Sequence, residues 1–356
     1  MINLDEYLQS KNFSGTILVK RNNKTIFSKA MGYANLSHKV PNNMNTMYGI
    51  ASVGKLFTAI STLLVLRDKK MTTRDEIYPF LETIDIDFEI PGGVTFHHLL
   101  THTSGIQRYY TIDPYFVPQT SLDQDRWKSF WKKQPNYLLQ SPVDYVPFLN
   151  GMDFVQPVGK TFYYTNTSYI LLGILIQVLS KQSYNNFVIN RILTLLNLER
   201  TRFLKFDEVY ENVADGHTPV YHQGNIKRWE KNIYRLPIIG SADGGIFSNA
   251  YDLEKLITEL RNKKGIFSDI ITDLIYPHVL MEKKDAYQYY YGYGITIMYQ
   301  NEEMVRYGLA GGDFGVAAGV YYYPKEQLSM IILSNHNTSD DNWMFSKEFH
   351  DLFLDL

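Results

Sequence analysis

The 356-residue chain contains no cysteine, which excludes disulfides, thiolate metal sites and cysteine nucleophiles. Net charge is also small, because 35 basic and 37 acidic side chains give -2 at pH 7. We therefore expect neither a nucleic-acid partner nor binding to an anionic membrane surface. The longest apolar run, residues 59–66, contains Ser61 and Thr62 and is far too short to span a bilayer, so no integral membrane segment is expected.

The first residues lack the basic and apolar regions of a signal peptide. This predicts a cytoplasmic protein as the sequence stands, or an exported one if a leader has been removed. Hydrophobic residues make up 45% of the chain, which is enough for a sizeable core. Oligomeric state is left open by the sequence.

Strand-like segments occur at both ends of the chain, at residues 16–21, 25–30, 291–299, 316–323 and 327–334. Helical periodicity dominates between them, at residues 168–179, 185–198 and 251–261, and short terminal helices are expected at 5–10 and 342–356. The pattern predicts an α/β (α+β) fold in which both termini form one antiparallel sheet flanked by helices. A mostly helical subdomain is expected to be inserted into it.

We place the α/β subdomain at residues 1–70 and 236–356 as one discontinuous unit, and the helical insert at 71–235. Within the insert, residues 107–158 form a long loop rich in aromatics and proline, and such loops are usually functional. Its aromatic side chains, including Tyr109, Tyr110 and Trp127, are compatible with the wall of a substrate cleft and equally with a small satellite core.

A Ser-x-x-Lys tetrad, Ser52 to Lys55, precedes apolar residues at helical spacing through residue 66. A helix that begins near Ser52 places Lys55 one turn along on the same face. The positive end of the helix dipole favours an alkoxide, and a partly desolvated lysine can act as its base. A second tetrad, Ser129 to Lys132, lacks a clean apolar periodicity, so the context favours Ser52 as the nucleophile and Lys55 as its activator.

A Tyr-x-Asn pattern, Tyr164 and Asn166, is the second candidate element. The spacing alone is uninformative, since four other tyrosines share it, but Tyr164 lies between a Pro-x-Gly turn and an apolar helix. A phenol beside a Ser–Lys pair can pass a proton to a leaving group. The Asn166 amide can position both Lys55 and a substrate carbonyl.

Ser52-Val-Gly-Lys55, Tyr164-Thr-Asn166 and residues 95–106 together resemble the class C β-lactamase-like serine hydrolases. That family includes penicillin-binding-type DD-peptidases, D-aminopeptidases and family VIII esterases. The resemblance runs from about residue 13 to residue 335. It implies a β-lactamase/transpeptidase-like fold and acyl-enzyme hydrolysis of a small ester, amide or peptide by Ser52, Lys55, Tyr164 and Asn166, with no metal and no cofactor.

The family's third element, Lys/His-x-Gly on a strand, corresponds to residues 307–315, where Leu309 occupies the cation position. Gly311 keeps the small residue that lets a substrate approach, and the amides of Gly312 and Ser52 resemble the family's oxyanion hole. Leu309 argues against efficient β-lactamase activity and against recognition of a substrate carboxylate. Leu309 motivates one alternative to a hydrolase, a catalytically weak penicillin-binding-like sensor or binding protein. An acyltransferase on the same scaffold, with an amine or alcohol replacing water, is a second alternative.

Two other patterns in the sequence partly match ligand-binding motifs. His98 and His102 have the i, i+4 spacing of a zinc helix, with His97 beside them, but the acid expected between them is absent. The glycines of residues 308–315 do not match the phosphate-binding pattern Gly-x-x-x-x-Gly-Lys-Ser/Thr, and a strand follows them rather than a helix. Neither pattern predicts a metal or phosphate site.

Overall fold

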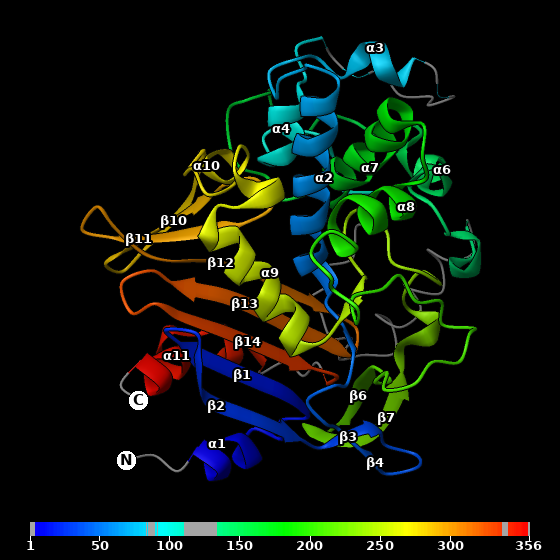
Figure 1. Cartoon of the computed structure of the whole chain (residues 1–356). Coiled ribbons are helices and arrows are strands. Elements are labelled where there is room, and N and C mark those ends of the chain that lie inside the picture. The colour runs from blue at the N-terminus through cyan, green and yellow to red at the C-terminus, as the bar shows by residue number, and fades with distance from the viewer. Residues whose placement is uncertain are drawn as a thin grey trace.

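The computed structural model describes residues 4–82, 84, 90, 92–109, 134–336 and 341–354. An eight-stranded sheet has the strand order β2-β1-β14-β13-β12-β11-β10-β9, so the N-terminal hairpin lies beside the C-terminal strand (Figure 1). Each pairing in this sheet is antiparallel. The predicted α/β fold, with a sheet built from both ends of the chain and flanked by helices, is therefore confirmed.

The strands of the large sheet are β1 (Gly15–Arg21), β2 (Lys24–Met31), β9 (Val279–Lys284), β10 (Tyr287–Tyr291), β11 (Thr296–Gln300), β12 (Glu303–Asp313), β13 (Val316–Tyr323) and β14 (Leu328–Ser334). Three two-stranded sheets pair β3 (Tyr33–Asn35) with β4 (Val40–Pro41), β5 (Tyr48–Gly49) with β8 (Phe247–Ser248), and β6 (His217–His222) with β7 (Asn225–Lys231).

The α-helices are α1 (Leu4–Ser10), α2 (Lys55–Asp68), α3 (Tyr78–Leu81), α4 (Phe96–Leu100), α6 (Val146–Leu149), α7 (Asn166–Ser180), α8 (Tyr184–Val188), α9 (Ala250–Asn262), α10 (Ile271–Leu274) and α11 (Lys347–Leu354). Shorter helical turns are η1 (Ala51–Gly54), η2 (Asn136–Leu138), η3 (Pro142–Tyr145), η4 (Ile189–Leu193, a π-helix), η5 (Asn232–Tyr234), η6 (Gly265–Phe267) and η7 (Asp341–Phe345).

Both faces of the sheet are covered by helices, and successive side chains of a strand therefore pack into different cores. In β1, Ile17 and Val19 pack with the terminal helices α1 and α11, whereas Leu18 joins the larger core formed with α2, α7 and α9. Every residue of β13 and β14 is buried as a result. Helix α2 is buried from Lys55 to Leu66, as expected for a helix in the centre of a core.

Three segments differ from the prediction. Residues 291–299 are not one strand: a turn with Gly294 at φ +66° separates β10 from β11 and packs against the backbone of Lys55. The helix expected at 185–198 is shorter, because α8 passes into the π-turn η4 and Asn197 adopts a left-handed φ of +51°. The hairpin of β6 and β7 was not predicted.

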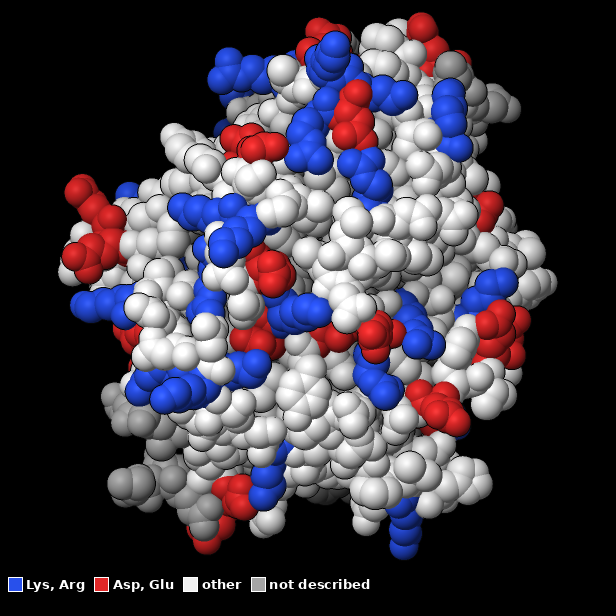
Figure 2. All heavy atoms as spheres, in the orientation of Figure 1, with Lys and Arg blue, Asp and Glu red and all other residues white. Residues whose placement is uncertain are grey.

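Basic and acidic side chains are intermixed on the face of the molecule shown in Figure 2. The small net charge of the sequence is thus not the sum of two large opposite patches on that face. Within the described part of the chain, the helices are too short or too polar to cross a membrane.

Candidate active site

Ser52 lies in a tight turn, η1, between β5 and α2. Ala51, immediately before it, has φ +45°, a left-handed conformation that costs a non-glycine residue roughly 1–2 kcal/mol. The turn is held from outside by a hydrogen bond from the Ile50 N–H to the Ile246 carbonyl (3.0 Å). Gly244 packs so closely against the Ala51 carbonyl that a Cβ there would lie 2.7 Å from its oxygen. Backbone strain is thus concentrated at the predicted nucleophile.

The Ser52 hydroxyl contacts two other predicted catalytic groups. The Tyr164 hydroxyl donates a hydrogen bond to Ser52 Oγ at 2.9 Å, and Lys55 Nζ lies 3.2 Å from the same oxygen. Helix α2 begins at Lys55 rather than at Ser52, but the three-residue spacing still places both side chains on one side of the turn. A serine between an amine and a phenol has a partner for accepting its proton and another for returning one.

The Lys55 amine is completely buried, and its polar contacts are specific. It donates to Asn166 Oδ1 at 2.7 Å and to the backbone carbonyl of Asp243. Burial lowers the pKa of Lys55 to about 8, although the Asp243 and Asp313 carboxylates oppose this shift. A neutral amine with its two N–H groups on Asn166 and Asp243 directs its lone pair to Ser52, which is the state required of a base.

Tyr164 and Asn166 reach the same site because Thr165 between them is extended, at φ −144° and ψ 132°. Side chains two residues apart on extended backbone point to the same side. The Thr165 hydroxyl also caps α7 by accepting from the Thr167 N–H at 3.2 Å. Burial raises the pKa of the Tyr164 phenol above its ordinary value, so the group is protonated at neutral pH and acts as a donor.

His102 holds this segment in place from beneath. Its ring packs against Tyr164 with centroids 4.4 Å apart, its Nδ1 accepts from the Thr165 N–H at 3.2 Å, and its Nε2 lies 3.2 Å from the Tyr291 hydroxyl. Burial keeps the pKa of His102 well below its usual value, so the ring is neutral. Helix α4 ends at Leu100, so the helical spacing considered for a zinc pair of His98 and His102 is not realised.

Strand β12 passes directly behind the nucleophile. A Cβ at Gly311 would lie 2.6 Å from the Ile50 oxygen and 2.8 Å from the Ser52 nitrogen, so only glycine fits there. Leu309 is 5% exposed and belongs to the main hydrophobic core. Gly312 is among the described residues that line the cavity at Ser52, whereas Leu309 and Gly311 are not, so the substrate-binding role expected of these two stays a prediction.

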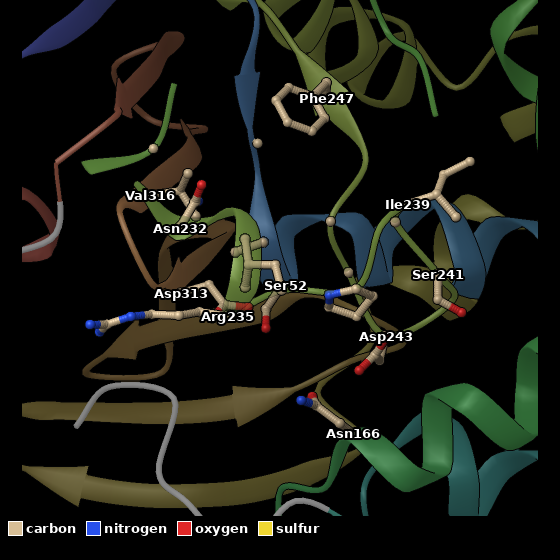
Figure 3. A pocket seen from close by; sticks show the side chains of 18 of the residues that line it. Ser52, Asn166, Asn232, Arg235, Ile239, Ser241, Asp243, Phe247, Asp313 and Val316 are labelled. Atoms are coloured by element: carbon tan, nitrogen blue, oxygen red, sulfur yellow. The ribbon is translucent and has the colours of Figure 1, made fainter. Parts of the chain in front are cut away.

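A cavity opens beside Ser52 and is lined by residues from several separate elements (Figure 3). Its polar side chains include those of Ser52, Asn166, Asn232, Arg235, Asp243 and Asp313. Gly312 and Tyr109 also line it, and the Tyr109 hydroxyl donates to the Asp243 carboxylate at 2.7 Å. Burial raises the pKa of Asp243, and it raises that of Asp313 to about 7.

The structure thus brings Ser52, Lys55, Tyr164 and Asn166 together and places Tyr109 at the cavity. Tyr110, Trp127 and the second tetrad from Ser129 to Lys132 lie outside the described residues.

Sequence reasoning missed the contributions of Asp243, Asp313 and His102. The adjacent glycines, Gly244 after Asp243 and Gly312 before Asp313, were the available signal, because glycine marks backbone that approaches another segment closely.

Residues 3–350 match the family model of the β-lactamases, and the chain belongs to this family. A teichoic acid D-alanine hydrolase from Staphylococcus aureus is 27% identical over 322 residues, which are 90% of this chain and 70% of the relative.

Two solved structures show a similar fold. A penicillin binding protein from Bacillus halodurans has a TM-score of 0.85 and 28% identity, covering 99% of this chain and 100% of that one. An octameric penicillin-binding protein homologue from Pyrococcus abyssi has a TM-score of 0.77 and 26% identity, covering 93% and 72%.

Proposed function

We propose that this chain is a serine hydrolase that acts on a small ester or amide through an acyl-enzyme. The proposal rests on the position of Ser52, which lines a cavity. Its Oγ lies 3.2 Å from Lys55 Nζ and 2.9 Å from the Tyr164 hydroxyl. Sequence relatives with hydrolase names support the reaction class.

In the first half of the reaction, Ser52 Oγ bonds to the substrate carbonyl carbon while its proton passes to the neutral Lys55 amine. The carbonyl oxygen becomes an oxyanion, held by the backbone N–H groups of Ser52 and Gly312, and each such donor typically contributes about 3 kcal/mol. The bond to the leaving alcohol or amine then breaks, and that group takes a proton through the Tyr164 hydroxyl.

In the second half, water attacks the acyl-Ser52 ester and the carboxylic acid is released. The water proton moves back through the same Lys55 and Tyr164 groups, so no other co-reactant is needed. Asn166 keeps the Lys55 amine aligned throughout, since it accepts one of its N–H groups.

The acyl group we propose first is D-alanyl, because the Staphylococcus aureus relatives are D-alanine hydrolases acting on teichoic acid. Leu309 supports this choice over a β-lactam or a C-terminal peptide. It provides no cation for a substrate carboxylate.

Labelling with a fluorophosphonate, followed by intact-mass spectrometry, tests the nucleophile. We expect one adduct on the wild-type chain and none on Ser52→Ala. Ser129→Ala is the matched control, because Ser129 begins the other Ser-x-x-Lys tetrad, and it should label normally. Adduct formation that persists in Ser52→Ala would refute the assignment.

The sensor and acyltransferase alternatives are separated from hydrolysis by the fate of the acyl-enzyme. A hydrolase regenerates free enzyme in water within the assay, whereas a sensor retains the acyl mass. An acyltransferase releases it faster when an added alcohol or amine competes with water. Leu309 favours the sensor as the second candidate, since it removes one charged element of the family's site.

A further inference from the structure

Strand β12 presents alternate residues to the nucleophile. Leu309 packs in the core that contains α2, whereas Ala310 packs on the opposite side of the sheet with α1 and α11. Gly311 faces the backbone of Ser52. By the same alternation, Asp313 is the next side chain on this face, and it lines the cavity together with Ser52.

Among the described residues that line the cavity, two acidic side chains stand beside one basic side chain, that of Arg235. Asp243 and Asp313 both line it. Arg235 forms an ion pair with Glu230 at 2.6 Å, among other contacts, and its guanidinium lies 5.2 Å from the centre of the Phe314 ring. Lys55 lies behind Ser52, where its N–H groups are directed to Asn166 and to the Asp243 carbonyl. Next to Asp313 and Asp243 themselves, a cationic group on a substrate gains favourable electrostatic energy and a carboxylate does not.

We propose that Asp313, assisted by Asp243, binds a primary ammonium group on the carbon next to the scissile carbonyl. The proposal rests on the hydrolase function above and assigns its substrate class: aminoacyl esters or amides with a free amine. Asp313 is a specificity residue, because it binds the part of the acyl group that does not react.

The position of Asp313 along β12 is compatible with binding an ammonium group next to the reaction centre. Asp313 directly follows Gly312, the proposed oxyanion donor, and consecutive Cα atoms are about 3.8 Å apart. Because the Asp313 side chain lines the same cavity as Ser52, we place the substrate amine on the Asp313 side of the scissile carbonyl. The Asp313 carboxylate accepts the Phe314 N–H at 2.8 Å, and because a carboxylate has about four acceptor positions, that bond does not by itself prevent it from accepting an ammonium N–H.

The electrostatics of the two carboxylates support the same assignment. Burial, together with a smaller contribution from the charge on Asp243, raises the pKa of Asp313 to about 7. A bound ammonium offsets both effects, because it favours the ionised form of a neighbouring carboxylate.

The test compares two esters that differ only in the amine: D-alanine methyl ester and methyl propionate, with methanol release followed by proton NMR. The measured quantity is the ratio of the two kcat/KM values within each variant. Any change that Asp313→Asn makes to the pKa of Lys55 alters both kcat/KM values by the same factor. The ratio therefore reports only on recognition of the amine. We expect wild type to prefer the D-alanine ester and Asp313→Asn to lower the ratio roughly 10- to 100-fold, as for loss of a charged hydrogen bond.

Asp269→Asn is the matched control, because Asp269 is an exposed aspartate outside the cavity, and it should leave the ratio unchanged. An unchanged ratio in Asp313→Asn overturns the proposal. The same holds for a wild-type enzyme that hydrolyses methyl propionate as well as the D-alanine ester.

Binding to Ser52→Ala, measured by titration calorimetry, tests the ammonium site without catalysis. D-Alaninamide should bind at least roughly tenfold more tightly than propanamide, and adding Asp313→Asn should remove the difference. Equal binding of the two amides overturns the proposal. If wild type hydrolyses neither ester but the amides still differ, the proposed hydrolase function fails and the ammonium site stands.

Discussion

One methyl group added at Gly311 should be enough to displace the nucleophile. Its carbon would lie 2.6 Å from the Ile50 oxygen, 2.8 Å from the Ser52 nitrogen and 2.9 Å from the Val53 nitrogen. The first distance is about 0.8 Å short of the 3.4 Å at which ordinary contact begins. All three neighbours are backbone atoms, so no side chain can rotate away. The turn η1 must move relative to β12.

The size of the effect follows from that displacement. A misplacement approaching 1 Å in an active site costs on the order of 10²-fold in rate, and loss of one oxyanion donor costs about 10²- to 10³-fold. We therefore expect Gly311→Ala to lower kcat/KM about 100-fold. Overpacking should also cost about 1–3 kcal/mol in the free energy of unfolding, which a protein of this size tolerates.

Hydrolysis of p-nitrophenyl acetate measures the rate, and a thermal melt with circular dichroism verifies the fold. Gly49→Ala is the matched control, because Gly49 lines the same cavity but its added carbon would lie 3.4 Å from a Val316 methyl, at ordinary contact distance. We expect it to retain activity within a few-fold of wild type, as a well-accommodated methyl group does. Full activity in Gly311→Ala, with hydrolysis still dependent on Ser52, would refute the argument that β12 positions the nucleophile.

Three further predictions follow from the same contacts. Tyr164→Phe should lower kcat about 100-fold on methyl esters, because the phenol donates a proton to the leaving alcohol. The loss should be much smaller on p-nitrophenyl esters, whose leaving group needs no proton. Equal losses on both would argue against a proton-donor role. The value of kcat/KM should rise with pH and level off above about 8, because only the neutral Lys55 amine accepts a proton. In Lys55→Arg, activity should fall by about 100-fold or more and the remaining activity should lose this rise with pH. A rise that persists in the variant would come from another group. Glu254→Ala should lower the free energy of unfolding by about 3 kcal/mol in urea titrations, because it leaves the mostly buried Lys20 without its partner at 2.6 Å. Asp269→Ala, which breaks an exposed pair, should cost less than about 1 kcal/mol, and equal losses would contradict the role of burial.

The fold was predictable where sequence patterns are local. The apolar run after Ser52 predicted α2, and the β-rich ends of the chain predicted one antiparallel sheet. The prediction failed at residues 291–299, where two glycines allow a turn that alternation alone does not reveal. The division into residues 1–70 with 236–356, and 71–235, stays a prediction.

The sequence by itself determined which groups are available: Ser52 and Lys55 three residues apart, Tyr164 and Asn166 two apart, and no cation at Leu309. Such spacings are fixed by the geometry of a helical turn and of extended backbone, which act within a few residues. Only the tertiary structure decided that the Asp243 carbonyl holds the Lys55 amine and that Asp313 faces the cavity beside Ser52. Those contacts join residues far apart in the chain, and burial, which lowers the pKa of Lys55, arises only when the core closes around it.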